Sequence, residues 1–496
     1  MKAIVVIENT RRFPLRLAGA DVVSARDYLL QGGWPGRRGL RVYNLCRTYG
    51  YQTLGYYVSL LAAARGHRPI PTVETLQDLR LAPVVRLVSE QLDDEIQRSL
   101  SRLKGPKFEL SIYFGRNLAK RYDALTRALY EQFPVPLLRA TFERRGHEWR
   151  LSSVRPIATI EIPESHRPFM MEQAEQHFGR RTRTSRAKRT FRYDMAILAD
   201  PDAAHAPSDK TALRRFVRAA RELDIEARLI GLEDAGDVAE YDALFIRETT
   251  AVNHATYRLS RRAATEGLVV IDDPVSILRC SNKVFLAELF ARHTIPHPKT
   301  VVGHADNIDA IADAVGLPCV LKRPDSAFSQ GVVRADTPES LRTHMTEFLR
   351  DSDLVVAQAF SPSKFDWRIG VLGGRALFAC QYHMARGHWQ IVVHGSTGKS
   401  RFGRVEAFSL DQVPAEAIDI AVRATALIGD GLYGVDIKET DQGCLVIEVN
   451  DNPNIDAGCE DAVIGDRLYF EVMDWFRQRL DARGTNGTPN GMPDGG

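Results

Sequence analysis

Two carboxylates and one carboxamide stand out among the apolar residues of a strongly β-forming segment, GVDIKETDQGCLVIEVNDNPN at residues 434–454. They belong to Asp436, Glu448 and Asn450. Their oxygen atoms are hard ligands, and a small, incomplete set of them suits a Mg²⁺ ion that completes its coordination with water and phosphate oxygens. The segment therefore predicts a magnesium site beside a phosphorylated molecule. The alternative is a pair of exposed surface acids whose repulsion Lys438 relieves.

A β-hairpin would bring these side chains onto one face. A three-residue turn at 441–443 places Asp436 opposite Glu448 and puts Asn450 on the same face. Two carboxylates that face each other across strands repel, so a cation is expected between them. The opposite face is expected to be apolar and buried, and it consists of Val435, Ile437, Leu445, Ile447 and Val449.

Residues that could hold a phosphate lie upstream of the hairpin. Lys322 ends the short apolar strand LPCVLK, and the small residues of the following DSAFSQG suit a mobile flap whose backbone amides approach phosphates. A P-loop is excluded at GSTGKS, residues 395–400, because only two residues separate its glycines where four are required. No G-x-G-x-x-G follows a strand, so the dinucleotide-binding fingerprint is also missing.

Composition limits the classes of protein that can carry such a site. A chain of 496 residues exceeds a single core and predicts about two to four domains. The 66 basic and 63 acidic residues nearly cancel, so the overall charge does not argue for a nucleic-acid or membrane partner. No apolar run approaches the ~18–20 residues of a membrane span. The six cysteines are scattered without a C-x-x-C pair, which favours a reducing cytoplasm.

The order of the expected elements predicts a multidomain α/β and α+β protein. A run of basic residues, GRRTRTSRAKRTFR, is interpreted as a solvated linker, with a nucleic-acid contact as the minor alternative. The expected divisions are an N-terminal α/β domain over 1–150, a connecting segment with the basic linker over 151–193, a small α/β domain over 194–280, an α+β module over 281–482, and a disordered tail over 483–496.

The ordered motifs SNK, VLKRP, a flap ending in glycine, VVAQAF, DWRIGV, GVDI and IEVNDNP resemble those of the ATP-grasp ligases, especially RimK-like and glutathione-synthetase-like members. This resemblance covers about residues 194–480. Residues 1–150 resemble the separate N-terminal domain that precedes some RimK-like modules. The resemblance implies an ATP-grasp core preceded by a small α/β domain, with ATP and Mg²⁺, or Mn²⁺ in its place, as cofactors.

The resemblance also implies roles for individual residues. Arg368 would face the transferred phosphate and the acyl group as the catalytic residue, and its alternative is an ordinary strand ion pair with Asp366. Asp436, Glu448 and Asn450 would hold one or two magnesium ions. The implied nucleotide-binding residues are Lys283 and Lys322 at the phosphates, Ser326, Ser329, Gln330 and Gly331 in the flap, and Gln358 and Ala359 at the adenine hinge.

The implied activity is that of a cytoplasmic ligase that phosphorylates a carboxylate and joins it to an amine. Its carboxylate would be a small molecule, a peptide or a protein tail, its amine could be an amino acid, and a homo-oligomer is left open. The alternatives are a kinase-like phosphotransferase and a non-catalytic nucleotide-binding regulatory module. Two departures from the family pattern, the missing R-x-N element and the replaced N-S-P-G, lie where the acceptor should bind, so the resemblance does not name the substrates.

Overall fold

A computed structural model shows mixed α/β and α+β architecture, as expected. It describes residues 3–8, 10, 17, 20–30, 40–183, 191–203, 205–325, 331–385, 387–394 and 400–485. Two compact units divide the chain. The first unit comprises Met1–Tyr193, Glu233–Glu240 and Asp481–Gly496, and the second comprises Asp194–Leu232 and Tyr241–Leu480. No helix within the described residues is long and apolar enough to cross a membrane.

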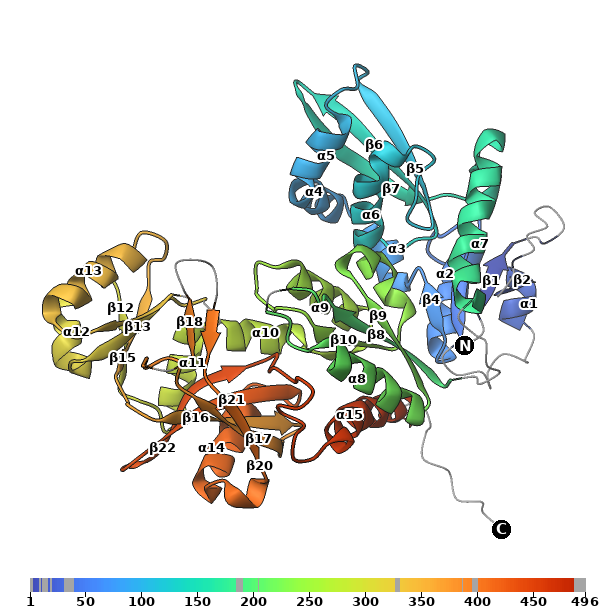
Figure 1. Ribbon diagram of the computed structural model, residues 1–496. Helices are drawn as coiled ribbons and strands as arrows, with labels where there is room; N and C mark the ends of the chain where they lie inside the picture. The colour runs from blue at the N-terminus through green and yellow to red at the C-terminus, as the bar shows by residue number, and fades with distance from the viewer. Residues whose placement is uncertain are drawn as a thin grey trace, which may run out of the picture. The chain divides into compact units, whose positions relative to one another are not determined.

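The first unit contains two sheets, drawn in blue and cyan in Figure 1. The parallel sheet has the order β2 (Ala20–Ser24), β1 (Ala3–Ile7), β3 (Arg41–Asn44), β4 (Arg68–Ile70). The antiparallel sheet has the order β5 (Lys107–Tyr113), β6 (Leu137–Arg145), β7 (Glu148–Pro156). Helices of this unit include α1 (Ala25–Leu30), α2 (Leu54–Ala64), α3 (Val73–Asp78), α4 (Ala82–Gln91), α5 (Asp93–Leu100), α6 (Asp123–Gln132) and α7 (Arg167–Arg183).

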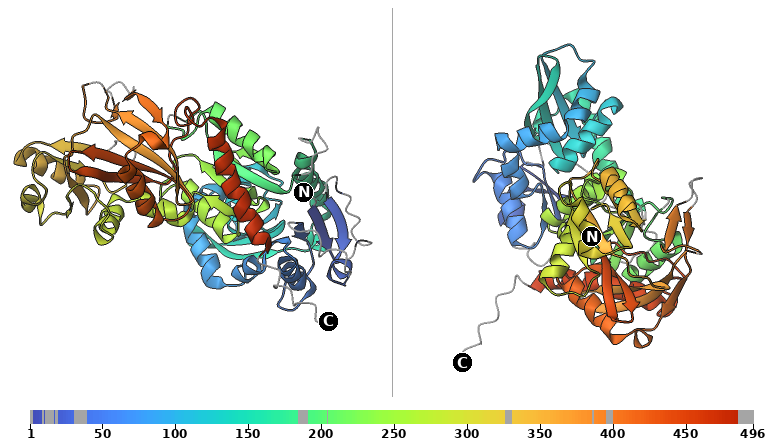
Figure 2. Two further views of the ribbon diagram at one scale, coloured as in Figure 1. Left: turned by 90° about the horizontal axis from the view of Figure 1, so that it is seen from below. Right: turned by 90° about the vertical axis from the view of Figure 1, so that its left-hand side faces the viewer.

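The second unit begins with a small α/β sheet. Its strand order is β11 (Val269–Ile271), β10 (Ala243–Arg247), β8 (Tyr193–Ala199), β9 (Ile225–Ile230). Helices α8 (Lys210–Glu222), α9 (Ala255–Thr265) and α10 (Pro274–Ser281) accompany it. The long helix α15 (Asp466–Thr485) packs beside α8 and β10, as Figure 2 shows, through ring contacts of Tyr469 with Phe216 and of Phe476 with Phe245. These contacts attach helix α15 to the small α/β sheet and its helix α8.

Two antiparallel sheets follow in the same unit. The four-stranded one has the order β12 (Thr300–Gly303), β15 (Val355–Ala359), β13 (Cys319–Lys322), β14 (Val332–Ala335). The five-stranded one has the order β20 (Val405–Phe408), β17 (Arg375–His383), β16 (Phe365–Leu372), β21 (Leu432–Thr440), β22 (Gly443–Asn450). A short pair, β18 (Val392–His394) and β19 (Ser400–Phe402), stands apart from both.

Helices cover one face of each antiparallel sheet. On the four-stranded sheet, α12 (Ile308–Val315) and α13 (Pro338–Phe348) close a core that includes Ile311 and Met345. On the five-stranded sheet, α14 (Ala415–Ala426) buries Ala417, Ile420 and Ala424 against alternate residues of β16 and β21. Because side chains alternate along a strand, the residues between those core positions project from the opposite face.

Several domain boundaries expected from the sequence fall inside observed helices or strands. Strand β7 continues to Pro156, across the expected boundary at residue 150. Helix α7 continues to Arg183, so the first part of the expected basic linker is helical, while residues 184–190 lie outside the described part. The expected disordered tail likewise begins too early, because α15 extends to Thr485. Residues 486–496 lie outside the described part, and the remaining domain limits stay predictions.

Candidate active site

The hairpin of β21 and β22 pairs the predicted residues. Asp436 lies opposite Glu448, and Gly434 lies opposite Asn450, as the alternation predicts. The expected three-residue turn is wrong, however, because Thr440 pairs with Gly443 around a two-residue turn. A β-bulge after Asp436 then absorbs one residue of β22 and restores the predicted pairing.

The shorter turn changes which side chains of β22 are buried. Between the turn and the bulge, the side chains of β22 point to the face opposite to the one predicted. The reason is that a one-residue change of register inverts the alternation of side chains along a strand. Cys444 and Val446 therefore enter the core, while Leu445 and Ile447, expected there, are only half-buried. Ile447 instead lines two cavities beside Lys322. The prediction that Val435, Ile437 and Val449 are buried is confirmed.

Each of the paired carboxylates contacts a cationic side chain. Arg368 is the neighbour of Asp436 across β16 and β21, and its Nε and Nη2 donate to the two oxygens of Asp436, the latter at 2.9 Å. Lys283 Nζ lies 2.9 Å from Glu448 Oε1. The expected alternative for Arg368, an ion pair with Asp366, is wrong because Asp366 pairs with Lys438. Because Lys438 pairs with Asp366, it is not the cation that offsets the repulsion between Asp436 and Glu448.

These contacts decide the charge of the carboxylates. Burial alone would raise the pKa of Glu448, but Lys283 and Lys322 lower it below its usual value. Burial raises the pKa of Asp436, and Arg368 offsets only part of that rise. Burial would lower the pKa of Arg368, yet Asp436 raises it, so the guanidinium stays charged. Asn450 completes the group by donating from Nδ2 to Asp436 Oδ2 at 3.3 Å.

The first lysine of the site is positioned by a helix cap. Asn282 accepts hydrogen bonds from the amides of Val284 and Phe285, which starts helix α11 (Lys283–Arg292) and makes Lys283 its first residue. The amide of Lys283 donates to the carbonyl of Pro324 at 2.9 Å. The SNK motif therefore places a lysine beside the segment that leads into the flap.

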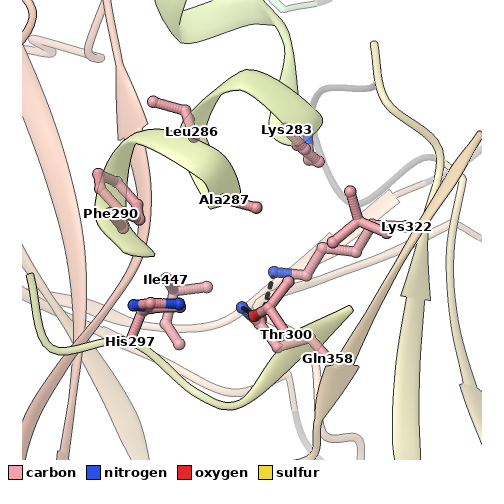
Figure 3. A pocket seen from close by; sticks show the side chains of 10 residues that line it. Lys283, Leu286, Ala287, Phe290, His297, Thr300, Lys322, Gln358 and Ile447 are labelled. Atoms are coloured by element: carbon pink, nitrogen blue, oxygen red, sulfur yellow. Dashed lines mark hydrogen bonds between the residues drawn. The ribbon is translucent and has the colours of Figure 1, made fainter. Parts of the chain in front are cut away.

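The second lysine lies at the junction of strands β13 and β15 (Figure 3). Lys322 Nζ donates to Gln358 Oε1 at 2.8 Å, and Gln358 Nε2 donates to Thr300 Oγ1 at 3.0 Å. Figure 3 shows these three side chains facing α11, which carries Lys283. Lys322 is buried, and desolvation lowers its pKa to about 8. This lysine is therefore held in place by a neutral partner.

A backbone hydrogen bond joins the described residues at the two ends of the expected flap. Arg323 N donates to Gly331 O at 2.9 Å, and Gly331 adopts a positive φ of 67°. A glycine favours this left-handed conformation because it has no Cβ. The predicted flap residues Ser326, Ser329 and Gln330 lie outside the described residues.

Two cavities meet at the carboxylate pair. A smaller cavity of about 140 Å³ is lined by Lys283, Lys322, Gln358 and Ala359 together with Asp436 and Glu448. A larger cavity of about 610 Å³ is lined by Arg368, Asn450 and the same two carboxylates. The predicted site residues in the described part are thus distributed around both cavities. A nucleotide in the smaller one and a second substrate in the larger one would approach each other at Asp436 and Glu448.

Some residues of the larger cavity were missed by the sequence analysis. Tyr382 lies under the guanidinium of Arg368, 4.8 Å from ring centroid to Cζ, and its hydroxyl donates to Glu460 Oε1 at 2.6 Å. Asp451, directly after Asn450, also lines this cavity, and burial raises its pKa to about 7. The replaced N-S-P-G motif marked the position of Asp451, whereas nothing local signals that Tyr382 and Glu460 meet.

Two family models match the chain. Residues 25–173 match the RimK-like ATPgrasp N-terminal domain, and residues 280–465 match the RimK-like ATP-grasp domain. Each model matches less than half of the chain, so these two segments are similar to the two domains of RimK-like ATP-grasp proteins. The resemblance drawn from the motifs is confirmed, and with it the use of ATP and divalent metal ions that is general in this family.

Two curated relatives are named as ligases, and one solved structure is also similar to part of this chain. A probable alpha-L-glutamate ligase of Psychromonas ingrahamii is 27% identical over 252 residues, which are 50% of this chain and 80% of that protein. The alpha-aminoadipate–LysW ligase LysX of Saccharolobus solfataricus is 29% identical over 219 residues, 42% of this chain and 75% of that protein. A RimK domain ATP-grasp protein of Sphaerobacter thermophilus aligns with a TM-score of 0.45 at 20% identity, over 57% of this chain and 98% of that one. The expected class of activity, ATP-dependent ligation of a carboxylate to an amine, is confirmed.

Proposed function

We propose that this protein uses ATP and Mg²⁺ to convert a carboxylate into an acyl phosphate, which an amine then attacks to form an amide or peptide bond. The observation that carries the proposal is the position of Asp436 and Glu448 where the two cavities meet. One cavity is lined by lysines suited to nucleotide phosphates, and the other is lined by Arg368. A phosphoryl group could therefore pass from one substrate to the other beside these residues.

The donor set fits a hard divalent ion. Asp436 and Glu448 are opposite each other, and Asn450 lies beside them, with its Nδ2 donating to Asp436. All are carboxylates or carboxamides, as Mg²⁺ prefers. Mg²⁺ bound here would neutralise negative charge on the transferred phosphate. Lys283 contacts Glu448, and Arg368 contacts Asp436.

The lysines and the hinge would bind the nucleotide. Lys322 and Lys283 line the smaller cavity, where each would act as a point charge toward phosphate oxygens. Gln358 already orients Lys322 and lies beside Ala359, so the family's adenine hinge fits these two positions. The roles of Ser326, Ser329, Gln330 and Gly331 as a closing flap rest on the family resemblance.

Arg368 would act on the second substrate. A carboxylate oxygen attacks the terminal phosphorus of ATP and ADP leaves; the amine nitrogen then attacks the acyl carbon, phosphate leaves and a proton is released. Negative charge develops on the phosphoryl oxygens and then on the tetrahedral intermediate. A preorganised guanidinium stabilises such charge without reorganising, and Asp436 and Tyr382 hold Arg368 for this role.

A screen of carboxylate and amine pairs tests the proposal. ADP release should require both substrates, and mass spectrometry should find an amide that has lost water relative to the pair. Oxygen-18 placed in the carboxylate should appear in the released phosphate, because that oxygen leaves with the phosphoryl group. ADP release with a phosphorylated product and no need for an amine would support a kinase-like phosphotransferase instead. Tight ATP binding without turnover would support a regulatory module.

The names of the relatives support a range of substrates for this chain. The relatives named above act, by their names, on glutamate or on alpha-aminoadipate and LysW. A small-molecule, peptide or protein-tail carboxylate therefore fits this chain, and an amino acid is one form of the amine. The cytoplasm, where ATP is supplied, is the proposed location.

A further inference from the structure

The chain segment that follows strand β17 contributes an aromatic side chain to the smaller cavity. Trp389, Gln390 and Ile391 line this cavity together with the two lysines and the carboxylate pair. They belong to the sequence HWQIVVHG, in the region where the R-x-N element of the family is missing. An arginine would bring a charge to this region, whereas Trp389 brings an indole ring with a large apolar surface. This part of the cavity is therefore suited to an aromatic group rather than to a phosphate.

The indole of Trp389 packs against the residue that follows the proposed adenine hinge. Its ring centroid lies 5.8 Å from that of Phe360, and the two ring planes are at 85°. Phe360 directly follows Ala359 and lines the same cavity. From strand β14, Arg334 places its Cζ 4.6 Å from the ring centroid of Phe360. These contacts hold an aromatic pair, Trp389 and Phe360, beside the hinge.

Hydrogen bonds position the segment that carries Trp389. Gln390 Nε2 donates to the carbonyl of Val332 on β14 at 3.3 Å, and the carbonyl of Gln390 accepts from the amide of Ala385 at 2.9 Å. His388 Nδ1 accepts from the amide of Gln390 at 3.1 Å. Strand β14 belongs to the same sheet as the hinge strand β15, so these bonds attach the indole to the sheet that carries the hinge.

The aromatic pair also borders an open groove of about 530 Å³. His388 stacks on Trp389, with centroids 5.8 Å apart and planes at 21°, and it lines the groove but not the smaller cavity. Trp389 and Phe360 line both hollows. The pair therefore forms part of the wall between the cavity and the groove, and a base at the hinge would lie against it.

We propose that Trp389 contacts the base of the nucleotide and determines how tightly the base is bound, with Phe360 and Gln390 positioning the indole. This inference rests on the proposed function and adds a binding residue to its nucleotide site. Loss of an aromatic partner from a stacked base costs about 5–150-fold in affinity. The lysines interact with phosphates and Trp389 interacts with the base, so the two contributions can be measured separately.

Ligands with and without a base test the proposal. ADP and inorganic tripolyphosphate are titrated by calorimetry, with Mg²⁺, into the full chain and its variants. Trp389→Ala should weaken ADP binding about 5–150-fold and leave the Kd of tripolyphosphate unchanged. Trp389→Phe keeps an aromatic face and should retain most of the ADP affinity. Lys322→Ala should weaken the binding of both ligands, because both carry phosphates.

Tryptophan fluorescence gives a second readout that does not depend on turnover. Saturating ADP should change the emission of the full chain, and the change should disappear in Trp389→Phe. The change should persist in the matched control Trp149→Phe, which removes a buried indole from strand β7 of the first unit. This measurement also decides the question if Trp389→Ala does not fold.

Three outcomes would overturn the inference. They are unchanged ADP affinity in Trp389→Ala, an equal loss of ADP and tripolyphosphate affinity in that variant, and an ADP-induced emission change that persists in Trp389→Phe. A full chain that binds neither ADP nor tripolyphosphate would instead contradict the proposed function.

Discussion

The two cavities that share Asp436 and Glu448 differ in how completely their polar groups are matched. In the smaller cavity, Lys322 donates to Gln358 and Lys283 contacts Glu448, so the charged groups already have partners. In the larger cavity, Asp451 retains an oxygen without a partner among the described residues. The larger cavity therefore contains a buried carboxylate oxygen that is unmatched among the described residues, whereas the two lysines of the smaller cavity are matched.

The largest expected effect separates the two sides by their kinetics. Arg368→Ala should lower kcat by about 10²–10³, as loss of one preorganised donor does, while ATP affinity changes only a few-fold. Turnover is measured by ADP release with the substrate pair found in the screen, and ATP affinity by calorimetry. Arg375→Ala, an exposed arginine on the adjacent strand, is the matched control and should retain activity. A large loss of ATP affinity in Arg368→Ala would contradict the assignment of separate roles to the two cavities.

The reverse pattern is expected on the nucleotide side. Lys322→Ala should weaken ATP binding by about 10–100-fold, since a charge-assisted hydrogen bond contributes about 1.5–3 kcal/mol. Calorimetric titration of ATP with Mg²⁺ measures the Kd. Lys104→Ala removes an exposed lysine from the N-terminal part of the chain and should bind ATP normally. Unchanged ATP affinity in Lys322→Ala would show that Lys322 has only a structural role.

The hairpin that both cavities share can be tested through its two neighbouring apolar residues. Val446→Ala should reduce the free energy of unfolding by about 2 kcal/mol, because Val446 is fully buried in the core. Ile447→Ala should reduce it much less and should instead weaken ATP binding a few-fold, because Ile447 lines the nucleotide cavity. Urea unfolding and ATP titration measure the two effects. The opposite ranking in stability would favour the three-residue turn.

The smallest expected effect is a pH dependence confined to the nucleotide side. Desolvation lowers the pKa of Lys322 to about 8, so in the nucleotide-free protein this lysine is charged below that pH and becomes neutral above it. Phosphates stay anionic, and ATP affinity should therefore fall by up to about tenfold between pH 7 and pH 9. In Lys322→Arg the guanidinium keeps its charge, and the fall should disappear. An equal fall in that variant would assign the effect to another group.

Much of the candidate site follows from local patterns. Alternation along β21 and β22 is enough to pair Asp436 with Glu448, because the period of a strand is two residues. A lysine at the end of an apolar strand and a lysine after a capping asparagine are likewise local features, and they correspond to Lys322 and Lys283. The family and its activity could be inferred for the same reason, since each motif is a short segment with its own backbone requirement.

Other features could not be inferred because several local solutions satisfy the same pattern. A two-residue turn followed by a bulge and a three-residue turn without one both pair Asp436 with Glu448, and only packing against α14 selects which of Val446 and Ile447 is buried. The partner of Arg368 was also undetermined, since Asp366 is near in sequence whereas Asp436 is brought beside it by pairing of β16 with β21.

The sequence by itself determined the chemical types of the site, which are two lysines, two carboxylates, an asparagine and an arginine at the spacing of strands and caps. The tertiary structure alone decided which of these groups neutralise one another and which remain available. It joined Tyr382 to Glu460, and it buried Asp451 with an oxygen that has no described donor. Desolvation and partnering depend on residues distant in the chain, so no local pattern encodes them.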